Sequence, residues 1–305
     1  MLISSSKKYN SFVKNYLSIN PGLKEYHYSL DTFKDGEWRL KFNDSVARES
    51  MIYVCGFVEE RDFLDFYDFT SECYYRGINK ITVLCPYIRN STQEKTSLQG
   101  NASLLRNRIN LLSATPMPEE NIEFYFLDLH SDLAVNYFPK KIRAYNLDSF
   151  EVFKNYLMSK SEPIVLTGAD QGQFKRVERW AQSLQMDYAC AFKIRKPDGV
   201  TGQGCTRNLT GANVVLVDDI IKTGETILSA AKTLKAEGVK DIEILATHGA
   251  ITIEAVTNLY NSGMIQRLTC TDSISTVNTI AESFPDFFKV IPSHSVFNEI
   301  IQSKC

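Results

Sequence analysis

Continuous apolar runs alternate with amphipathic stretches along this chain of 305 residues, and this alternation constrains the fold more than any other feature. Apolar runs without polar interruptions are typical of strands buried on both faces of a sheet. They occupy 51–57, 81–85, 122–127, 163–166, 188–192, 214–217 and 242–246. Stretches of helical periodicity lie between most of them, at 61–75, 104–112, 150–158, 174–184 and 226–237. This order predicts an α/β fold with mainly parallel sheets and crossover helices.

Two of the expected helices show which side faces the core. In 61–75, which Gly77 ends, we assign the buried face to Phe63, Leu64 and Tyr67. In 226–237 the apolar positions follow i, i+3, i+4, i+7 spacing, which is that of a core-facing stripe, and they are Ile227, Ala230, Ala231 and Leu234. Gly238 is the expected C-cap of this second helix.

Chain length favours two domains, 1–145 and 146–305. Hydrophobic residues make up 44% and charged residues 23%, the balance of a folded globular protein. The net charge of -2 gives no indication of a nucleic-acid or membrane surface. We therefore expect small-molecule substrates, with neither nucleic acid nor membrane as a partner.

The seven cysteines are scattered, odd in number and without a CxxC pair. A disulfide framework or a zinc site is therefore not expected, and a reducing compartment fits best. The start of the chain lacks the basic-then-apolar order of a signal peptide. No run approaches the ~18 apolar residues of a membrane span. These features predict a cytoplasmic protein.

The segment 193–212 departs from the alternation. It is rich in turn residues and charges, with four glycines and Pro197 but few apolar residues. A loop of this length inside a compact domain is typical of an active-site lid or of a disordered segment.

The most specific motif runs from Val214 to Thr226. Four apolar residues lead into Asp218 and Asp219, which we place at the carboxyl end of a strand, the edge where open α/β sheets bind ligands. A short loop then opens a helix, and its members suit a phosphate group: Lys222, Thr223, Gly224, Glu225 and Thr226. The competing interpretation is a strand ending in solvated acids before an ordinary helix.

This motif resembles the phosphoribosyl-pyrophosphate loop of type I phosphoribosyltransferases. Further matches, in the same order along the chain, are similar to the ribose-phosphate diphosphokinases, also called phosphoribosyl pyrophosphate synthetases. The matching segments are Phe33-Lys-Asp-Gly-Glu37, Asp128-Leu-His130, Lys193-Ile-Arg195 and Thr247-His-Gly249. The resemblance implies two phosphoribosyltransferase-like domains, each a mainly parallel sheet flanked by helices. The domain 1–145 would carry the ATP-side loops, and 146–305 the sugar-phosphate loop and the catalytic flexible loop.

The resemblance implies a reaction in which the β,γ-diphosphoryl group of ATP passes to the anomeric hydroxyl of ribose 5-phosphate. Lys193 and Arg195 would be catalytic residues that stabilise the transferring group. Taken alone, the pair reads as two solvated cations in a surface loop.

The resemblance also implies a Mg²⁺–ATP site. His130 and Asp170 would hold the metal, with Asp128 nearby, and a sparse ligand set is usual for Mg²⁺. A lone histidine is more often structural than a ligand, but this one directly follows a buried strand at the ligand-binding edge.

ATP itself would be bound by two segments. Phe33, with Asp35 and Glu37, would contact adenine from a neighbouring subunit, so the resemblance implies a homo-oligomer, a dimer or a hexamer. Arg89 and Asn90 would contact the nucleotide as well. Without the resemblance, 33–37 is a plain β-turn with Gly36 at a positive φ.

The chain departs from the family pattern in both sites. Asn90 and Ser91 replace the Gln and Asp that follow Arg89 in the family, and Lys222 stands where this branch usually has Asp. A cation at 222 favours more negative charge at the 5′ end of the sugar. Three further readings therefore stay open: ADP-ribose as the acceptor, a non-catalytic regulatory subunit, and a transferase that consumes phosphoribosyl pyrophosphate.

Overall fold

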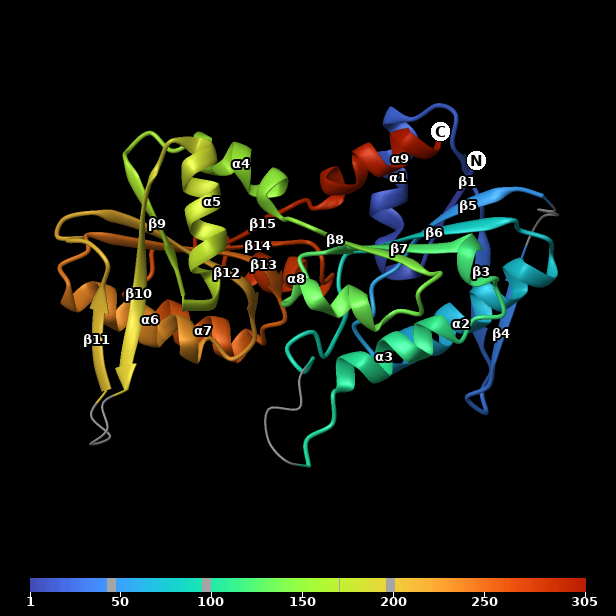
Figure 1. Ribbon diagram of the computed structural model, residues 1–305, viewed down its shortest axis with the longest axis horizontal. Coiled ribbons are helices and arrows are strands. Elements are labelled where there is room, and N and C mark those ends of the chain that lie inside the picture. The colour runs from blue at the N-terminus through green and yellow to red at the C-terminus, as the bar shows by residue number, and fades with distance from the viewer. Residues whose placement is uncertain (43–47, 95–99, 170, 196–200) are drawn as a thin grey trace. The chain divides into compact units, whose positions relative to one another are not determined.

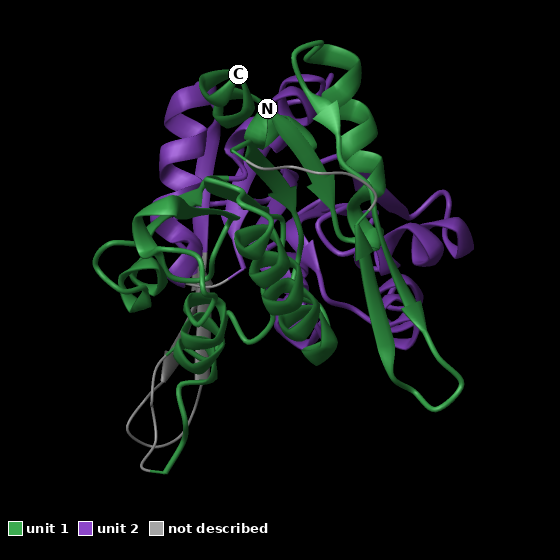
Figure 2. Cartoon of the chain, turned by 90° about the vertical axis from the view of Figure 1, so that its right-hand side faces the viewer, with its two compact units in different colours: residues 1–148, 294–305 green, residues 149–293 purple. Residues whose placement is uncertain are grey.

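The structure is a computed structural model that describes residues 1–42, 48–94, 100–169, 171–195 and 201–305, with the backbone alone at 171, 191–195 and 201–204. The chain forms two compact units (Figure 2). Unit 1 comprises 1–148 and 294–305, and unit 2 comprises 149–293. The predicted domain 146–305 runs to the C-terminus, whereas residues 294–305 belong to the first compact unit.

Unit 1 contains a parallel sheet in the strand order β2-β1-β5-β6-β7-β8 (Figure 1). Its strands are β1 (Leu2–Ser5), β2 (Lys24–Glu25), β5 (Ser50–Val54), β6 (Lys80–Cys85), β7 (Ile122–Leu127) and β8 (Arg143–Leu147). The central strands are buried on both faces, as their continuous apolar sequences predict.

Helices cover both faces of this sheet. One face packs against α1 (Asn10–Ile19) and α9 (Asn298–Lys304), and the other against α2 (Glu60–Tyr75) and α3 (Leu104–Ser113). The side of α2 that faces the core was predicted only in part. Phe63 is 5% exposed, but Leu64 and Tyr67 are 54% and 42% exposed. Phe66 and Phe69 are buried instead, because the helix carries two aromatic stripes and the sequence does not say which one meets the sheet.

A separate antiparallel hairpin, β3 (Tyr28–Thr32) and β4 (Trp38–Phe42), interrupts the βα order of unit 1. Its five-residue connection 33–37 is closed by hydrogen bonds from Phe33 N to Glu37 O, 2.7 Å, and from Gly36 N to Phe33 O, 3.0 Å. Gly36 has a φ of 92°, as a turn glycine should.

Unit 2 contains a sheet in the order β11-β10-β9-β12-β13-β14-β15, parallel except for the edge pair β10–β11. Its strands are β9 (Ile164–Gly168), β10 (Asp187–Arg195), β11 (Thr201–Cys205), β12 (Asn213–Ile221), β13 (Asp241–Gly249), β14 (Arg267–Thr271) and β15 (Phe288–Ile291). The expected irregular loop 193–212 is thus partly regular, because β10 extends to Arg195 and pairs with β11.

Five helices flank the unit 2 sheet. In Figure 1, α4 (Phe150–Met158) and α5 (Phe174–Leu184) lie on one face. The other face packs against α6 (Glu225–Ala236), α7 (Ile253–Asn261) and α8 (Thr276–Ser283). All four predicted core positions of α6 are buried, and Gly238 follows it with a φ of 78°. Five 3₁₀ turns complete the described chain: Lys7–Tyr9, Glu119–Asn121, Asp132–Tyr137, Gln171–Gln173 and His294–Phe297.

Both units therefore show the predicted fold class, a mainly parallel sheet flanked by helices. Within the described residues, no helix is long and apolar enough to cross a membrane. None of the seven cysteines, all of which lie in the described residues, forms a disulfide, and five of them are buried.

Candidate functional site

Two carboxylates lie side by side near the carboxyl end of β12. Asp219 is 2% exposed, while Asp218 is half-buried. The amide Nε2 of Gln173 donates to Asp219 Oδ1 at 2.8 Å and is 3.3 Å from Asp218 Oδ1. A neutral donor that bridges two acids holds their side chains in place without neutralising them. Sequence reasoning missed Gln173, because nothing local indicates a partner 45 residues away.

The segment that follows has the form of an anion cradle. Gly224, with a φ of 76°, is the N-cap of α6, so the N–H groups of the first helical turn open beside it. The first of them, that of Glu225, is 3.4 Å from Thr223 Oγ1. A Cβ on Gly224 would lie 3.2 Å from the Leu259 side chain, so both backbone angle and space favour glycine. The other predicted members of the cradle are exposed: Lys222, Thr223, Glu225 and Thr226.

Lys222 has a perturbed ammonium group. Desolvation by the surrounding protein lowers the pKa of Lys222, and the nearby Asp219 carboxylate opposes that shift. The Lys222 side chain is nevertheless exposed to solvent, so an anion can reach it. Lys222 therefore loses its charge at a lower pH than an ordinary surface lysine.

The backbone of Lys193 and Arg195 belongs to the outer part of β10. Cys190 of β10 is level with Gly168 of β9, which in turn is level with Val217 of β12. Lys193 thus lies three residues beyond the level of Val217, in the segment of β10 that pairs with β11. The sheet therefore carries this segment past the same carboxyl edge that holds Asp218.

Unit 1 places the proposed metal residues at the carboxyl end of β7. Asp128 is 2% exposed with a φ of 51°, and its N–H donates to Leu147 O at 2.8 Å. His130 is exposed at the same edge. Asp170 lies outside the described residues. Among the residues that are described, no three or more His, Cys, Asp or Glu side chains gather as a metal cluster.

Arg89 and Asn90 follow β6 at that edge. Arg89 Nε is 3.5 Å from Glu60 Oε1. Asn90 adopts a φ of 64°, which Asn tolerates better than most residues, and donates to Gln93 Oε1 at 3.0 Å. Its buried Oδ1 has no hydrogen-bond partner within the described part of the chain. This leaves an acceptor available next to the arginine.

Phe33, Asp35 and Glu37 lie at the tip of the β3–β4 hairpin. Phe33 is 48% exposed, an unusual position for a large aromatic ring, and the Arg39 guanidinium lies 5.5 Å from the ring centroid. Asp35 Oδ1 accepts from the Glu37 N–H at 3.1 Å, which orders the turn. The ring therefore lies at the tip of the hairpin beside a cation, with about half of its surface exposed to a planar ligand.

A family model described as "Phosphoribosyl transferase domain" matches residues 143–256. The matched segment contains the acid pair, the anion cradle and the β10–β11 hairpin.

Curated relatives match over most of the chain. A ribose-phosphate pyrophosphokinase of Methanosarcina acetivorans is 26% identical over 272 residues, covering 88% of this chain and 90% of that protein. The protein of the same name from Thermotoga maritima is 26% identical over 303 residues, covering 95% and 89%. The one from Pyrococcus abyssi is 29% identical over 201 residues, covering 66% and 67%.

A solved structure shares the arrangement of elements. The phosphoribosylpyrophosphate synthetase of Mycobacterium smegmatis aligns with a TM-score of 0.85 and 20% identity, covering 99% of this chain and 98% of that one. At this identity the match establishes the fold.

Proposed function

We propose that this chain, which belongs to the ribose-phosphate pyrophosphokinase family and has its phosphoribosyltransferase fold, transfers the β,γ-diphosphoryl group of ATP to the anomeric hydroxyl of ribose 5-phosphate. The observation that carries the proposal is the acid pair Asp218–Asp219 followed by the Gly224 cradle at one sheet edge. In the reaction the hydroxyl oxygen bonds to the β-phosphorus and loses its proton, the bond between the β-phosphorus and the oxygen bridging to the α-phosphate breaks, and AMP leaves.

The cradle residues would bind the sugar. Asp218 and Asp219 are oriented by Gln173 and would accept hydrogen bonds from the two vicinal ribose hydroxyls. The first N–H groups of α6, with the Thr223 and Thr226 hydroxyls, would hold the 5′-phosphate, and Glu225 lies on the outer side of the loop. This arrangement would fix the anomeric hydroxyl and lower the entropic part of the barrier.

Lys193 and Arg195 would supply fixed positive charge to the phosphoryl oxygens that gain charge during transfer. The position of their backbone beyond the carboxyl edge of the sheet supports this role.

Asp128, His130 and Asp170 would hold Mg²⁺. The chemistry of the donors fits, because one buried carboxylate and one exposed imidazole at the end of β7 leave most coordination positions to water and phosphate oxygens, as Mg²⁺ prefers. When bound, the metal would neutralise charge on the phosphate oxygens of ATP. Arg89 and Asn90 would contact the nucleotide directly.

Phe33 would stack on adenine while Asp35 and Glu37 accept from its exocyclic amine. An exposed ring on a protruding hairpin suits a site on another subunit, so we propose a homo-oligomer. The relatives are named as metabolic enzymes, and we propose the cytoplasm as the compartment.

A second candidate acceptor is favoured by Lys222. Because its side chain is exposed beside a cradle that would already hold one phosphate, Lys222 suits the second phosphate of ADP-ribose.

The deciding experiment incubates the wild-type protein with Mg²⁺–ATP and each acceptor in turn, and follows AMP release. Ribose 5-phosphate should give AMP, and Lys193→Ala and Arg195→Ala should each lower kcat at least a hundredfold with an unchanged far-UV spectrum. Lys222→Asp should leave turnover of ribose 5-phosphate intact but raise the KM for ADP-ribose about tenfold for each ~1.4 kcal/mol lost. Absence of AMP with both acceptors would refute the diphosphokinase proposal.

A further inference from the structure

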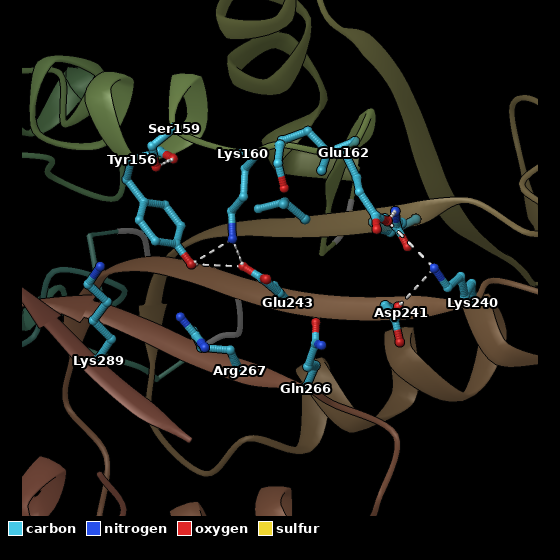
Figure 3. Close-up of a pocket in the computed structure, with 15 residues that line it drawn as sticks. Tyr156, Ser159, Lys160, Glu162, Lys240, Asp241, Glu243, Gln266, Arg267 and Lys289 are labelled. Atoms are coloured by element: carbon cyan, nitrogen blue, oxygen red, sulfur yellow. Dashed lines mark hydrogen bonds and ion pairs between the residues drawn. The ribbon is translucent and has the colours of Figure 1, made fainter. Parts of the chain in front are cut away.

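A second pocket lies in unit 2, at the opposite edge of the sheet from the cradle. It has a volume of about 580 Å³ and is lined by the amino ends of β9, β12, β13 and β14, by β15 and by the end of α4 (Figure 3). Asp218 lies five residues after Asn213 in this pocket, which corresponds to roughly 16 Å along β12. The pocket is therefore distinct from the proposed catalytic site.

Most of the charges in the pocket are already paired. Lys160 Nζ forms an ion pair with Glu243, and the Tyr156 hydroxyl donates to Glu243 Oε2 at 2.8 Å. At the other end, Lys240 Nζ is 3.5 Å from Glu162 Oε2 and 3.9 Å from Asp241 Oδ2. Two lysines and a hydroxyl therefore already engage these three acids.

Two cations remain without an acidic partner in the described part of the chain, Arg267 and Lys289. Arg267 is level with Glu243 on the neighbouring strand, and Lys289 is level with Thr269, two residues farther along the same face. Lys289 Nζ lies 4.9 Å from the centroid of the Tyr156 ring. In Figure 3, Arg267, Lys289 and Tyr156 occupy the same end of the pocket. A pair of cations beside an aromatic ring suits a doubly charged anion, and the guanidinium fork matches phosphate oxygens.

Asn213 supplies an unfilled acceptor at the other end. Its Nδ2 donates to Glu162 Oε2 at 2.8 Å, which fixes the orientation of the amide. Its buried Oδ1 then has no hydrogen-bond partner among the described residues. A buried acceptor in this state favours a ligand that brings an N–H or O–H donor.

We propose that this pocket binds a small phosphorylated compound, with its phosphate on Arg267 and Lys289 and a hydrogen-bond donor on Asn213. β12 and β14 are two strands apart, and Asn213 is two residues before the level of Arg267. With strands ~4.8 Å apart and ~3.3 Å per residue, the two ends are separated by roughly 12 Å. This is the length of a nucleoside monophosphate. The inference does not depend on the proposed reaction.

The test is equilibrium dialysis with two radiolabelled probes, orthophosphate and cytidine 5′-monophosphate, which carries an amino donor far from its phosphate. The number of probe molecules bound per chain is measured for wild type and variants. Besides the probe bound at the cradle and at the proposed nucleotide site, wild type should bind one molecule of each probe at this pocket. Arg267→Gln/Lys289→Gln should lose the pocket site for both probes, with the affinity there falling at least tenfold. Asn213→Ala should weaken cytidine monophosphate about 2- to 10-fold and leave orthophosphate unchanged.

Control variants separate this site from the cradle and from net charge. Lys140→Gln/Lys232→Gln removes two exposed cations elsewhere and should bind as wild type does. Thr223→Ala/Thr226→Ala should lose only the cradle site, so a chain without sugar-phosphate activity would still show the pocket site. An unfolding scan confirms that each variant is folded. If Arg267→Gln/Lys289→Gln binds the same number of probe molecules with the same affinity as Lys140→Gln/Lys232→Gln, the proposal is wrong.

Discussion

At the scale of single residues, Gly224 has a backbone conformation that the proposed phosphate site requires. Its φ of 76° costs a residue with a Cβ about 1–2 kcal/mol, and the Leu259 contact at 3.2 Å adds crowding. Gly224→Ala should therefore displace the first N–H groups of α6. We expect the KM for the phosphorylated sugar to rise at least tenfold and the free energy of unfolding to fall by about 1–2 kcal/mol.

Gly22→Ala is the matched control. No atom lies within 4 Å of the Cβ that would be built there, and no left-handed φ is recorded at that glycine. It should leave both the KM and the unfolding free energy within about 0.5 kcal/mol of wild type. A Gly224→Ala protein with an unchanged KM would show that the cradle does not hold the sugar phosphate.

Lys222 gives a prediction about pH. Desolvation lowers the pKa of Lys222, so its positive charge is present below that lowered pKa and is lost as the pH rises through it. If the ammonium binds the second phosphate of ADP-ribose, the KM for ADP-ribose should rise on the alkaline side, before ordinary lysines titrate. Lys222→Arg should abolish that rise, because a guanidinium stays charged. An identical alkaline profile in wild type and Lys222→Arg would exclude this role.

The residues of the candidate site differ in how far sequence reveals them. Val214 to Thr226 is contiguous, so strand, acids and cradle are readable from one short string. Gln173 contacts Asp218 and Asp219 although more than forty residues separate them in the sequence. No local pattern therefore predicts this contact. The ligand roles given to Asp128 and His130 stay predictions, as does that of Asp170.

At the scale of elements, periodicity predicted the crossover helices and central strands well, since those are long and strongly patterned. It failed where pattern was ambiguous. In α2, Leu64 and Tyr67 lie on the exposed stripe, whereas Phe66 is buried. The pattern could not tell the two sides apart, because aromatic residues occur on both. The strand predicted at 188–192 is the inner part of β10, but the end of β10 and all of β11 fall in the segment predicted as an irregular loop, since its glycine-rich sequence has no apolar alternation to mark strands.

The C-terminal helix α9 is fixed to unit 1 by a buried charge. Burial alone would raise the pKa of Glu123, but hydrogen bonds from Lys304 and Thr82 and the charges of Lys304 and Lys80 outweigh it and lower that pKa. Lys304 Nζ is 2.7 Å from Glu123 Oε1, and the Glu123 side chain is 3% exposed. Lys304→Ala should therefore lower the free energy of unfolding of unit 1 by about 1–3 kcal/mol at neutral pH.

The sign of the pH dependence follows from the lowered pKa of Glu123. The stabilisation is fully present above the unfolded-state pKa of about 4.3 and is lost as the pH falls through the lower folded-state value. Chemical unfolding of wild type and Lys304→Ala between pH 7 and pH 3 measures it. We expect the difference between them to shrink at the acid end, with Lys232→Ala, an exposed lysine, as control. A difference that is constant with pH would mean that packing of α9, rather than the ion pair, accounts for it.

At the scale of the whole molecule, the exposed Phe33 hairpin makes a prediction about assembly. If the tip completes a neighbour's nucleotide site, a Phe33→Ala protein and a Lys193→Ala protein should each be nearly inactive. Mixed under conditions that exchange subunits, they should regain activity, because some Phe33→Ala subunits then receive an intact hairpin from a Lys193→Ala neighbour. Steady-state AMP release against mixing ratio measures this. Purely additive residual activity at every ratio would show that Phe33 does not act on another subunit.

The fold class was predictable from sequence because βα alternation leaves few alternatives. The limits of the two compact units were harder to predict from the sequence. The predicted division falls at 145/146, whereas the units divide at 148/149, within a stretch that carries no turn-rich linker. Nothing in the amphipathic pattern of residues 294–305 indicates that Phe297 and Ile301 pack on the sheet of unit 1.

That return of the chain makes unit 2 an insertion between two parts of unit 1. During synthesis, unit 2 leaves the ribosome whole and can fold at once, while unit 1 must wait for its last helix. A premature stop near residue 294 would thus leave the later-made unit intact and expose the part of the unit 1 sheet face that Phe297 and Ile301 cover. Chaperones and proteases would then recognise the product by its N-terminal half.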